Sequence, residues 1–177
     1  MIITVNELKQ FITTDQSDTV LENKLQALEL LVRKYTNNNF QNTKIRFKCN
    51  ASSTGLDFST PYLNVNDTIQ ISQSQFNDGL YVIKSNESAT IALDKTPYDE
   101  PNVLVTKIEY PYDIKMGVIN MIKWDLTNRD KVGIQSETIS RHSVSYFNMD
   151  GDNSLMGYPR SLLGFLEPYK RARFWIW

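Results

Sequence analysis

The residue types that most often carry catalysis are scarce in this chain of 177 residues, which has one histidine, His142, and one cysteine, Cys49. A serine–histidine–acid triad or a cysteine–histidine pair would have to use His142, and no nucleophile motif accompanies it. A zinc site made of cysteine and histidine ligands needs more of both residues than one chain supplies. We therefore expect no catalytic site, no metal and no cofactor, and we interpret His142 as structural or interfacial.

Two further sequence patterns bear on whether the chain binds a calcium ion or a phosphate group. Residues 148–153 (NMDGDN) carry amide or acidic side chains at every second position, at Asn148, Asp150 and Asp152, which hints at a calcium-binding loop. Counted from Asn148 the twelfth residue is Pro159, and counted from Asp150 it is Ser161, so the glutamate that closes such a loop is missing. The seven glycines match neither the phosphate-loop pattern nor the dinucleotide pattern. We interpret residues 148–153 as a turn.

The C-terminal segment interleaves cations with aromatic side chains. Residues 159–177 carry four basic residues against one glutamate, so they hold a positive charge while the whole chain has a net charge of −1. Termini fray unless something holds them, so this segment either packs on its own fold or docks on another protein. Arginine and large aromatics are enriched in interface hot spots, which favours docking. The predicted docking residues are Tyr169, Lys170, Arg171, Arg173, Phe174, Trp175 and Trp177.

Composition limits the function classes. Apolar residues make up 41% and charged residues 22%, as in soluble globular proteins, and no apolar run is long enough to span a membrane. The near-neutral charge argues against bulk attraction to nucleic acid, although the exposed side of residues 44–48 and the C-terminal segment could contact phosphates. With one cysteine and no leader-like segment, we expect synthesis in a reducing cytoplasm.

The chain falls into three zones. In residues 1–41, Thr4 and Glu7 have the spacing of a capping box that opens a short helix. A second helix, capped by Ser17 or Asp18, carries an apolar stripe with helical spacing. That stripe consists of Leu21, Leu25, Leu28, Val32 and Tyr35. We expect the two helices to form a hairpin.

Residues 42–110 change to the alternating pattern of strands. Strands are expected at residues 44–49, 68–72, 80–85, 89–93 and 103–108, separated by turn residues. Cys49 shares one face of the first strand with Ile45 and Phe47, so we interpret it as a small core residue. The strands make a small sheet or barrel inserted between two helical zones.

Residues 111–177 return to helix. Asp113 is expected to cap a helix whose apolar face holds Ile114, Val118, Met121 and Ile122. A polar stretch follows, and a last helix opens at Pro159. The predicted fold class is α+β: a small helical bundle formed by residues 1–41 and 111–177, with an inserted short-stranded β subdomain at 42–110.

Four segments resemble signatures of one protein family. Residues 74–82 (SQFNDGLYV) resemble "S-x-F-N-D-G-x-Y-x-V", and residues 110–115 (YPYDIK) resemble "YP-x-DV-K". Residues 131–146 (KVGIQSETISRHSVSY) resemble "K-x-GI-x-SE-x-ISRHSV-x-Y", the most specific of the four. Residues 157–159 and 165–170 resemble "GYP…FLxPYKK". The family is that of the head–tail connectors, or adaptors, of long-tailed phages that infect Gram-positive bacteria, and residues 174–177 have no counterpart in its pattern.

The resemblance implies a structural virion protein rather than an enzyme. In that family, copies form a dodecameric ring beneath the portal vertex, which joins the DNA-filled head to the stopper and tail. The implied partners are the portal protein, the head-completion stopper protein and further copies of the chain. DNA would pass through the ring without sequence-specific binding, and no membrane is involved. The implied location is the virion neck, after synthesis in the bacterial host cytoplasm.

Two assignments complete this hypothesis. The C-terminal docking residues named above would bind the portal. The polar block of residues 136–146 is poorly explained as core. We therefore expect it to lie at the boundary between neighbouring copies. Its predicted interface residues are Ser136, Glu137, Thr138, Ser140, Arg141, His142 and Tyr146. The alternative is a small cytoplasmic enzyme or regulatory binding module whose site the sequence hides.

Overall fold

The computed structural model describes residues 1–87, 89–131, 136–139, 142–145 and 153–172. The chain divides into two compact units. The barrel unit consists of Asn39–Tyr110 together with Met1, and the helical unit of Ile2–Asn38 and Pro111–Trp177. Among the described residues, no helix has the length and apolar character needed to cross a membrane.

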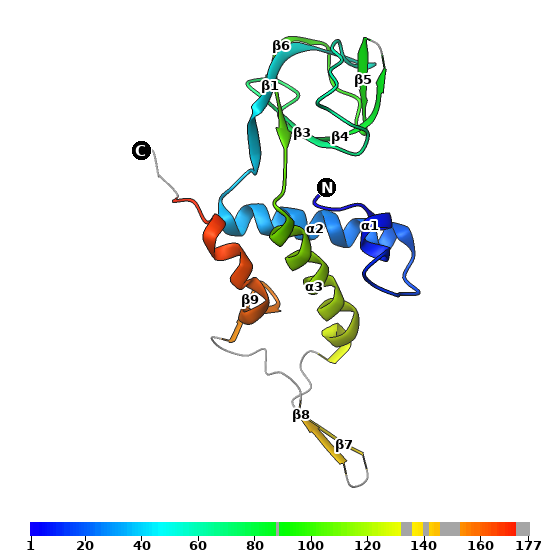
Figure 1. Cartoon of the computed structure of the whole chain (residues 1–177), viewed down its shortest axis with the longest axis vertical. Helices are drawn as coiled ribbons and strands as arrows, with labels where there is room; N and C mark the ends of the chain where they lie inside the picture. Colours follow the sequence, from blue (N-terminus) through cyan, green and yellow to red (C-terminus); the bar gives the residue numbers. More distant parts are fainter. Residues whose placement is uncertain (88, 132–135, 140–141, 146–152, 173–177) are drawn as a thin grey trace. The chain divides into compact units, whose positions relative to one another are not determined.

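The barrel unit is a closed antiparallel barrel whose strands curl round a common interior (Figure 1). Its strands are β1 (Gln41–Ser52), β2 (Gly55–Leu56), β3 (Thr68–Ser72), β4 (Gly79–Glu87), β5 (Thr90–Leu93) and β6 (Glu100–Ile108). They pair in the order β1-β2-β5-β4-β3-β6, and β6 pairs with β1 to close the ring of strands. Closure removes the unpaired strand edges that an open sheet would expose.

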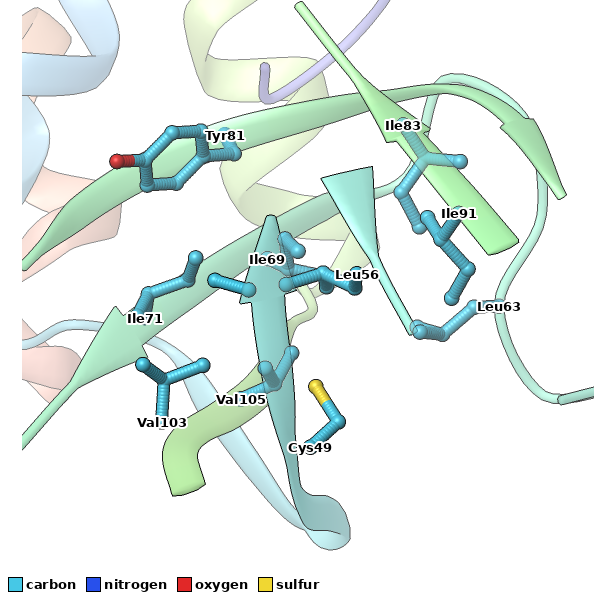
Figure 2. Packing of buried hydrophobic residues seen from close by; sticks show 11 residues of the cluster. Cys49, Leu56, Leu63, Ile69, Ile71, Tyr81, Ile83, Ile91, Val103 and Val105 are labelled. Atoms are coloured by element: carbon cyan, nitrogen blue, oxygen red, sulfur yellow. The ribbon is translucent and has the colours of Figure 1, made fainter. Parts of the chain in front are cut away.

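Side chains of alternate strand residues fill the barrel interior (Figure 2). The buried cluster includes Leu56, Ile69, Ile71, Ile83, Ile91, Val103 and Val105. Cys49 lies among them with 9% of its surface exposed, and burial, followed by the negative charge of Asp57, raises the pKa of its thiol to about 11. The interpretation of Cys49 as a core residue is therefore confirmed.

The helical unit begins with a short helix and a long one. α1 (Val5–Lys9) has the predicted capping box: the Thr4 amide donates to the Glu7 carboxylate at 2.8 Å, and the Glu7 amide donates to the Thr4 hydroxyl at 3.2 Å. α2 (Asp18–Thr36) buries Leu21, Leu25, Leu28 and Val32 as expected, and it ends at Asn37 in the left-handed conformation. The predicted apolar stripe is thus the packed face of α2.

The third helix and the C-terminal segment pack on each other (Figure 1). α3 (Tyr112–Asn128) buries Ile114, Val118, Met121 and Ile122. Pro111 holds its N-cap position, so the predicted cap at Asp113 is wrong. A Cβ atom on Gly117 of α3 would lie 2.3 Å from the Phe165 ring, so glycine is what lets the C-terminal segment approach.

The remaining elements are short. They are η1 (Arg129–Lys131), β7 (Ser136–Ile139), β8 (His142–Ser145), β9 (Ser154–Leu155), β10 (Tyr158–Pro159) and the 3-10 segment η3 (Arg160–Tyr169). The expected last α-helix is therefore a 3-10 segment, with Pro168 inside it.

The predicted fold class, a small helical bundle with a small β insertion, is wrong. The β part is a closed barrel of six strands. Among its described residues, the helical part holds the α-helices α1, α2 and α3, with a 3-10 segment in place of the expected last helix. Alternation located five of the strands, but it could not show β2, which is two residues long and links β1 to β5. Barrel closure depends on such long-range pairing, which local periodicity does not contain.

Candidate interaction surfaces

The C-terminal segment is anchored by its side chains at Tyr169 and Lys170. The Tyr169 hydroxyl donates to the Asp113 carboxylate at 2.8 Å, which raises the pKa of that hydroxyl. The Lys170 ammonium donates to Glu167 at 2.8 Å and lies 4.2 Å from the centre of the Tyr35 ring. Tyr35 also donates to Glu167, at 2.7 Å, and the bonds from Lys170 and then Tyr35 lower the pKa of Glu167.

The backbone of the same segment is held by the end of α2. The Arg171 amide donates to the Thr36 carbonyl at 2.8 Å. The side-chain amide of Asn38 donates to the Tyr169 carbonyl at 3.2 Å, and that of Asn37 to the Ala172 carbonyl at 3.1 Å. Through residue 172 the chain is therefore fixed on its own fold.

The predicted docking residues fall into three groups. Tyr169 and Lys170 use their polar atoms within the helical unit, while Arg171 has an exposed side chain. Arg173, Phe174, Trp175 and Trp177 lie outside the described residues. The anchor fixes the chain as far as Ala172, where the described residues end.

The polar block that ends at Tyr146 contains a β-hairpin. β7 pairs antiparallel with β8, with Thr138 opposite Ser143 and Ile139 opposite His142. Within the described part of the chain, neither strand pairs with any other. A two-stranded hairpin is at best marginally stable alone in water.

The predicted subunit-interface residues fall partly on this hairpin. Ser136, Glu137 and Thr138 lie in β7, and His142 lies in β8. Ser140, Arg141 and Tyr146 lie outside the described residues.

The structure shows one surface that sequence reasoning missed, on two loops of the barrel unit. Phe76, between β3 and β4, and Tyr98, between β5 and β6, are 66% and 68% exposed, and their ring centres are 6.1 Å apart. Phe76 belongs to one of the motif segments, but the motif gives it no role. Its pairing with Tyr98 depends on which loops the barrel brings together.

The Glu100 carboxylate braces the loop that carries Phe76. It accepts hydrogen bonds from the Ser74 hydroxyl at 2.5 Å, the Gln75 amide at 2.7 Å and the Asn77 side chain at 3.0 Å. The Ser74 and Gln75 bonds are the main reason that the pKa of Glu100 is lowered. Asn77 also bonds the Tyr98 backbone in both directions, at 2.7 and 3.0 Å, so the two loops form one braced unit.

The helical unit contains a polar network centred on Asp125, which is 8% exposed. Lys24 donates to Asp125 at 2.5 Å, and Arg129 donates through Nε at 2.6 Å. The Arg129 guanidinium also lies 4.8 Å from the centre of the Tyr158 ring and 5.2 Å from that of Trp124. The network joins α2, α3 and the β10 strand, so we interpret it as structural.

In the part of the chain that the structure describes, no three or more histidine, cysteine, aspartate or glutamate residues are grouped to hold a metal ion. The calcium-like motif lies outside that part except for Asn153. No model of a known protein family matches the chain, and no curated protein matches it.

Proposed function

We propose that this protein is a head–tail connector of a long-tailed phage, a structural component of the virion neck. Copies form a ring, dodecameric as in the family, between the portal vertex and the stopper, and the ring continues the DNA channel. The observation that carries the proposal is the run of residues 131–146, which resembles the connector signature almost continuously. Three further segments along the chain resemble the same family.

One feature of the structure supports an assembly role. The β7–β8 hairpin inside that run pairs with no other strand of the described chain, as expected of an element that is completed by a neighbour. In a ring, each copy presents two different surfaces to its two neighbours. We propose that the hairpin contributes one of them.

The C-terminal segment supplies the contact with the portal in this proposal. The anchor at Tyr169–Ala172 holds the segment on the helical unit as far as residue 172, and the aromatic and basic residues 173–177 follow directly in the sequence. Aromatic anchors that fill pockets contribute most to interfaces of this kind. Repeated round a ring, even a moderate contact gives high avidity.

Removal of residues 174–177 tests this assignment. We expect the shortened chain to unfold at the same temperature as the full chain and to lose binding to portal rings encoded by the same genome. Thermal unfolding of the monomer and co-elution with the portal rings measure the two effects separately. A destabilised monomer that still binds the portal would contradict portal docking, because the segment would then pack on its own fold.

A matched control keeps the full chain length and removes one exposed aromatic side chain outside the C-terminal segment. Tyr112 is 85% exposed at the start of α3 and belongs to no predicted docking group. The Tyr112→Ser variant should bind portal rings as the unchanged chain does. Equal losses in both variants would show that the assay reports general surface apolarity and not a specific C-terminal contact.

A further inference from the structure

Two loops of the barrel unit form an exposed surface that the proposed function has not used. It consists of Phe76, Tyr98 and the carboxylates of the same loops, and it is called here the aromatic patch. Both rings are about two-thirds exposed, although aromatic side chains gain more from burial than most others. The rings face solvent as a tilted pair with centres 6.1 Å apart. Exposed aromatics held in one place are typical of binding surfaces.

The patch is rigid before any partner arrives. Glu100 and Asn77 hold the two loops together through the hydrogen bonds described above, and the Asn77 amide also donates to the Ser74 hydroxyl at 2.6 Å. The Tyr81 hydroxyl donates to the Asn77 carbonyl at 3.1 Å and ties the loop to β4. A surface ordered in advance loses little conformational entropy when it binds.

The patch is also negatively charged. Asp78, Asp94 and Asp99 lie on the two loops, and none of them forms an ion pair with a described residue. Lys95 is the only cation in these loops, and it lies 5.9 Å from the centre of the Tyr81 ring, with its ammonium donating to the Leu80 carbonyl. A partner that fits this surface must therefore be basic.

The same barrel carries a surface of opposite charge. Lys44, Arg46 and Lys48 alternate along β1 and all three are exposed; they are called here the cationic row. Lys44 and Lys48 form no ion pair with any described residue. Arg46 donates to Thr106 at 3.0 Å and to Gln41 at 3.2 Å, which are both neutral.

We propose that the aromatic patch of one copy binds the cationic row of a second copy. Cations of the row pair with the patch carboxylates and lie over the exposed faces of Phe76 and Tyr98, an arrangement that aromatic rings favour. Because the closed barrel has no free strand edge, a contact between barrel units has to use side chains. The two surfaces differ, so the contact is head-to-tail and repeats from copy to copy. The inference rests on the proposed ring, for which it supplies a contact between neighbours.

Disulfide trapping between two full-length variants tests the contact directly. One variant carries Tyr98→Cys, and the other carries Lys48→Cys and a mass tag that distinguishes mixed dimers. Native Cys49 is buried and its thiol pKa is raised to about 11, so it stays largely protonated and reacts slowly. We expect a mixed dimer when the two variants are combined under mild oxidation, with a yield that falls as salt is added.

A matched control uses Tyr62→Cys in place of Tyr98→Cys. Tyr62 is 67% exposed, as Tyr98 is, and lies on the loop between β2 and β3. We expect the Tyr98→Cys pair to trap at least about 10-fold more mixed dimer than this control, because only its thiol lies in the proposed contact, where binding raises the effective concentration of the two thiols. Equal yields from the two pairs, or no mixed dimer from either, would overturn the inference.

A second measurement guards against misfolded variants. Lys44→Glu placed in the chain that carries Lys48→Cys should lower the trapping yield without changing thermal unfolding, because Lys44 forms no described ion pair within its own barrel. An unchanged yield would also overturn the inference. If the chain forms rings on portals but the Tyr98–Lys48 pair does not trap, only the barrel contact fails. If no ring forms on portals, the proposed function fails, whatever the trapping result.

Discussion

Asp125 brings three polar side chains of the helical unit together: Lys24, Arg129 and Tyr158. Burial alone would raise the pKa of Asp125, but the hydrogen bonds and charges of Lys24 and Arg129 outweigh it and lower the pKa. A carboxyl whose pKa is lower in the folded state binds fewer protons there than in the unfolded chain. The stability it contributes is therefore present above the unfolded pKa, about 3.9, and is lost as pH falls through the folded pKa.

Asp125→Asn tests this account at the residue scale. We expect the variant to lose about 2 kcal/mol of unfolding free energy at pH 7, because Lys24 and Arg129 lose their charged partner. The loss should shrink as pH falls below the unfolded pKa, about 3.9, and on through the lowered folded pKa, because protonation then removes the charge of Asp125 in the unchanged chain as well. Urea unfolding at several pH values measures both effects.

Asp130→Asn is the matched control, since Asp130 is exposed, follows Arg129 directly and forms no described ion pair. It should change stability by less than about 0.5 kcal/mol. A loss in Asp125→Asn that stays constant down to pH 2 would show that the carboxylate charge is not what stabilises the network.

At the scale of the elements, β2 closes the barrel because it pairs with both β1 and β5. Gly55 lets β2 approach β5 closely. Gly55 has a φ of +134°, and a Cβ there would lie 2.1 Å from the Ile91 carbonyl oxygen of β5. We expect Gly55→Ala to destabilise the barrel by about 2 kcal/mol or more, through backbone strain and this clash. Thermal unfolding of the variant measures the loss.

Gly79→Ala provides the control in the same barrel. A Cβ on Gly79 meets only the Tyr81 ring, at the ordinary contact distance of 3.8 Å. This variant should unfold within a few degrees of the unchanged chain. If both variants were equally stable, β2 would not be needed for closure.

We predict that the hairpin formed by β7 and β8 is needed for assembly and not for folding. Scrambling residues 138–143 should leave thermal unfolding nearly unchanged, because the hairpin pairs with no other strand of the described chain. The same change should abolish incorporation into virions if the hairpin lies between copies. Mass spectrometry of purified particles checks incorporation, and normal incorporation would contradict the interface assignment.

How much the sequence could predict differs between elements and surfaces. The capping box at Thr4, the buried face of α2 and the strand at Thr68–Ser72 follow from local patterns, and the structure confirms them. Closure through β2 does not, because β2 must also pair with β5, which lies far along the chain. The apolar spacing of residues 160–169 does not distinguish a 3-10 segment from an α-helix. The Phe76–Tyr98 pair could not be found either, since only the fold brings its two loops together.

At the scale of the whole molecule, the chain combines a closed barrel unit with a helical unit that anchors an aromatic C-terminal segment. The hairpin pairs with no other described strand, and both rings of the aromatic patch are exposed. In the proposed assembly, the hairpin and the patch join neighbouring copies, and the C-terminal segment joins each copy to the portal.

Electron microscopy of the purified full chain mixed with portal rings from the same genome tests the central claim most directly. We predict added ring-shaped density on one face of the portal, with one copy of this chain beside each portal subunit and an open channel along the axis. Portal rings that stay bare while the chain remains separate, at concentrations at which the chain is folded, would contradict the account.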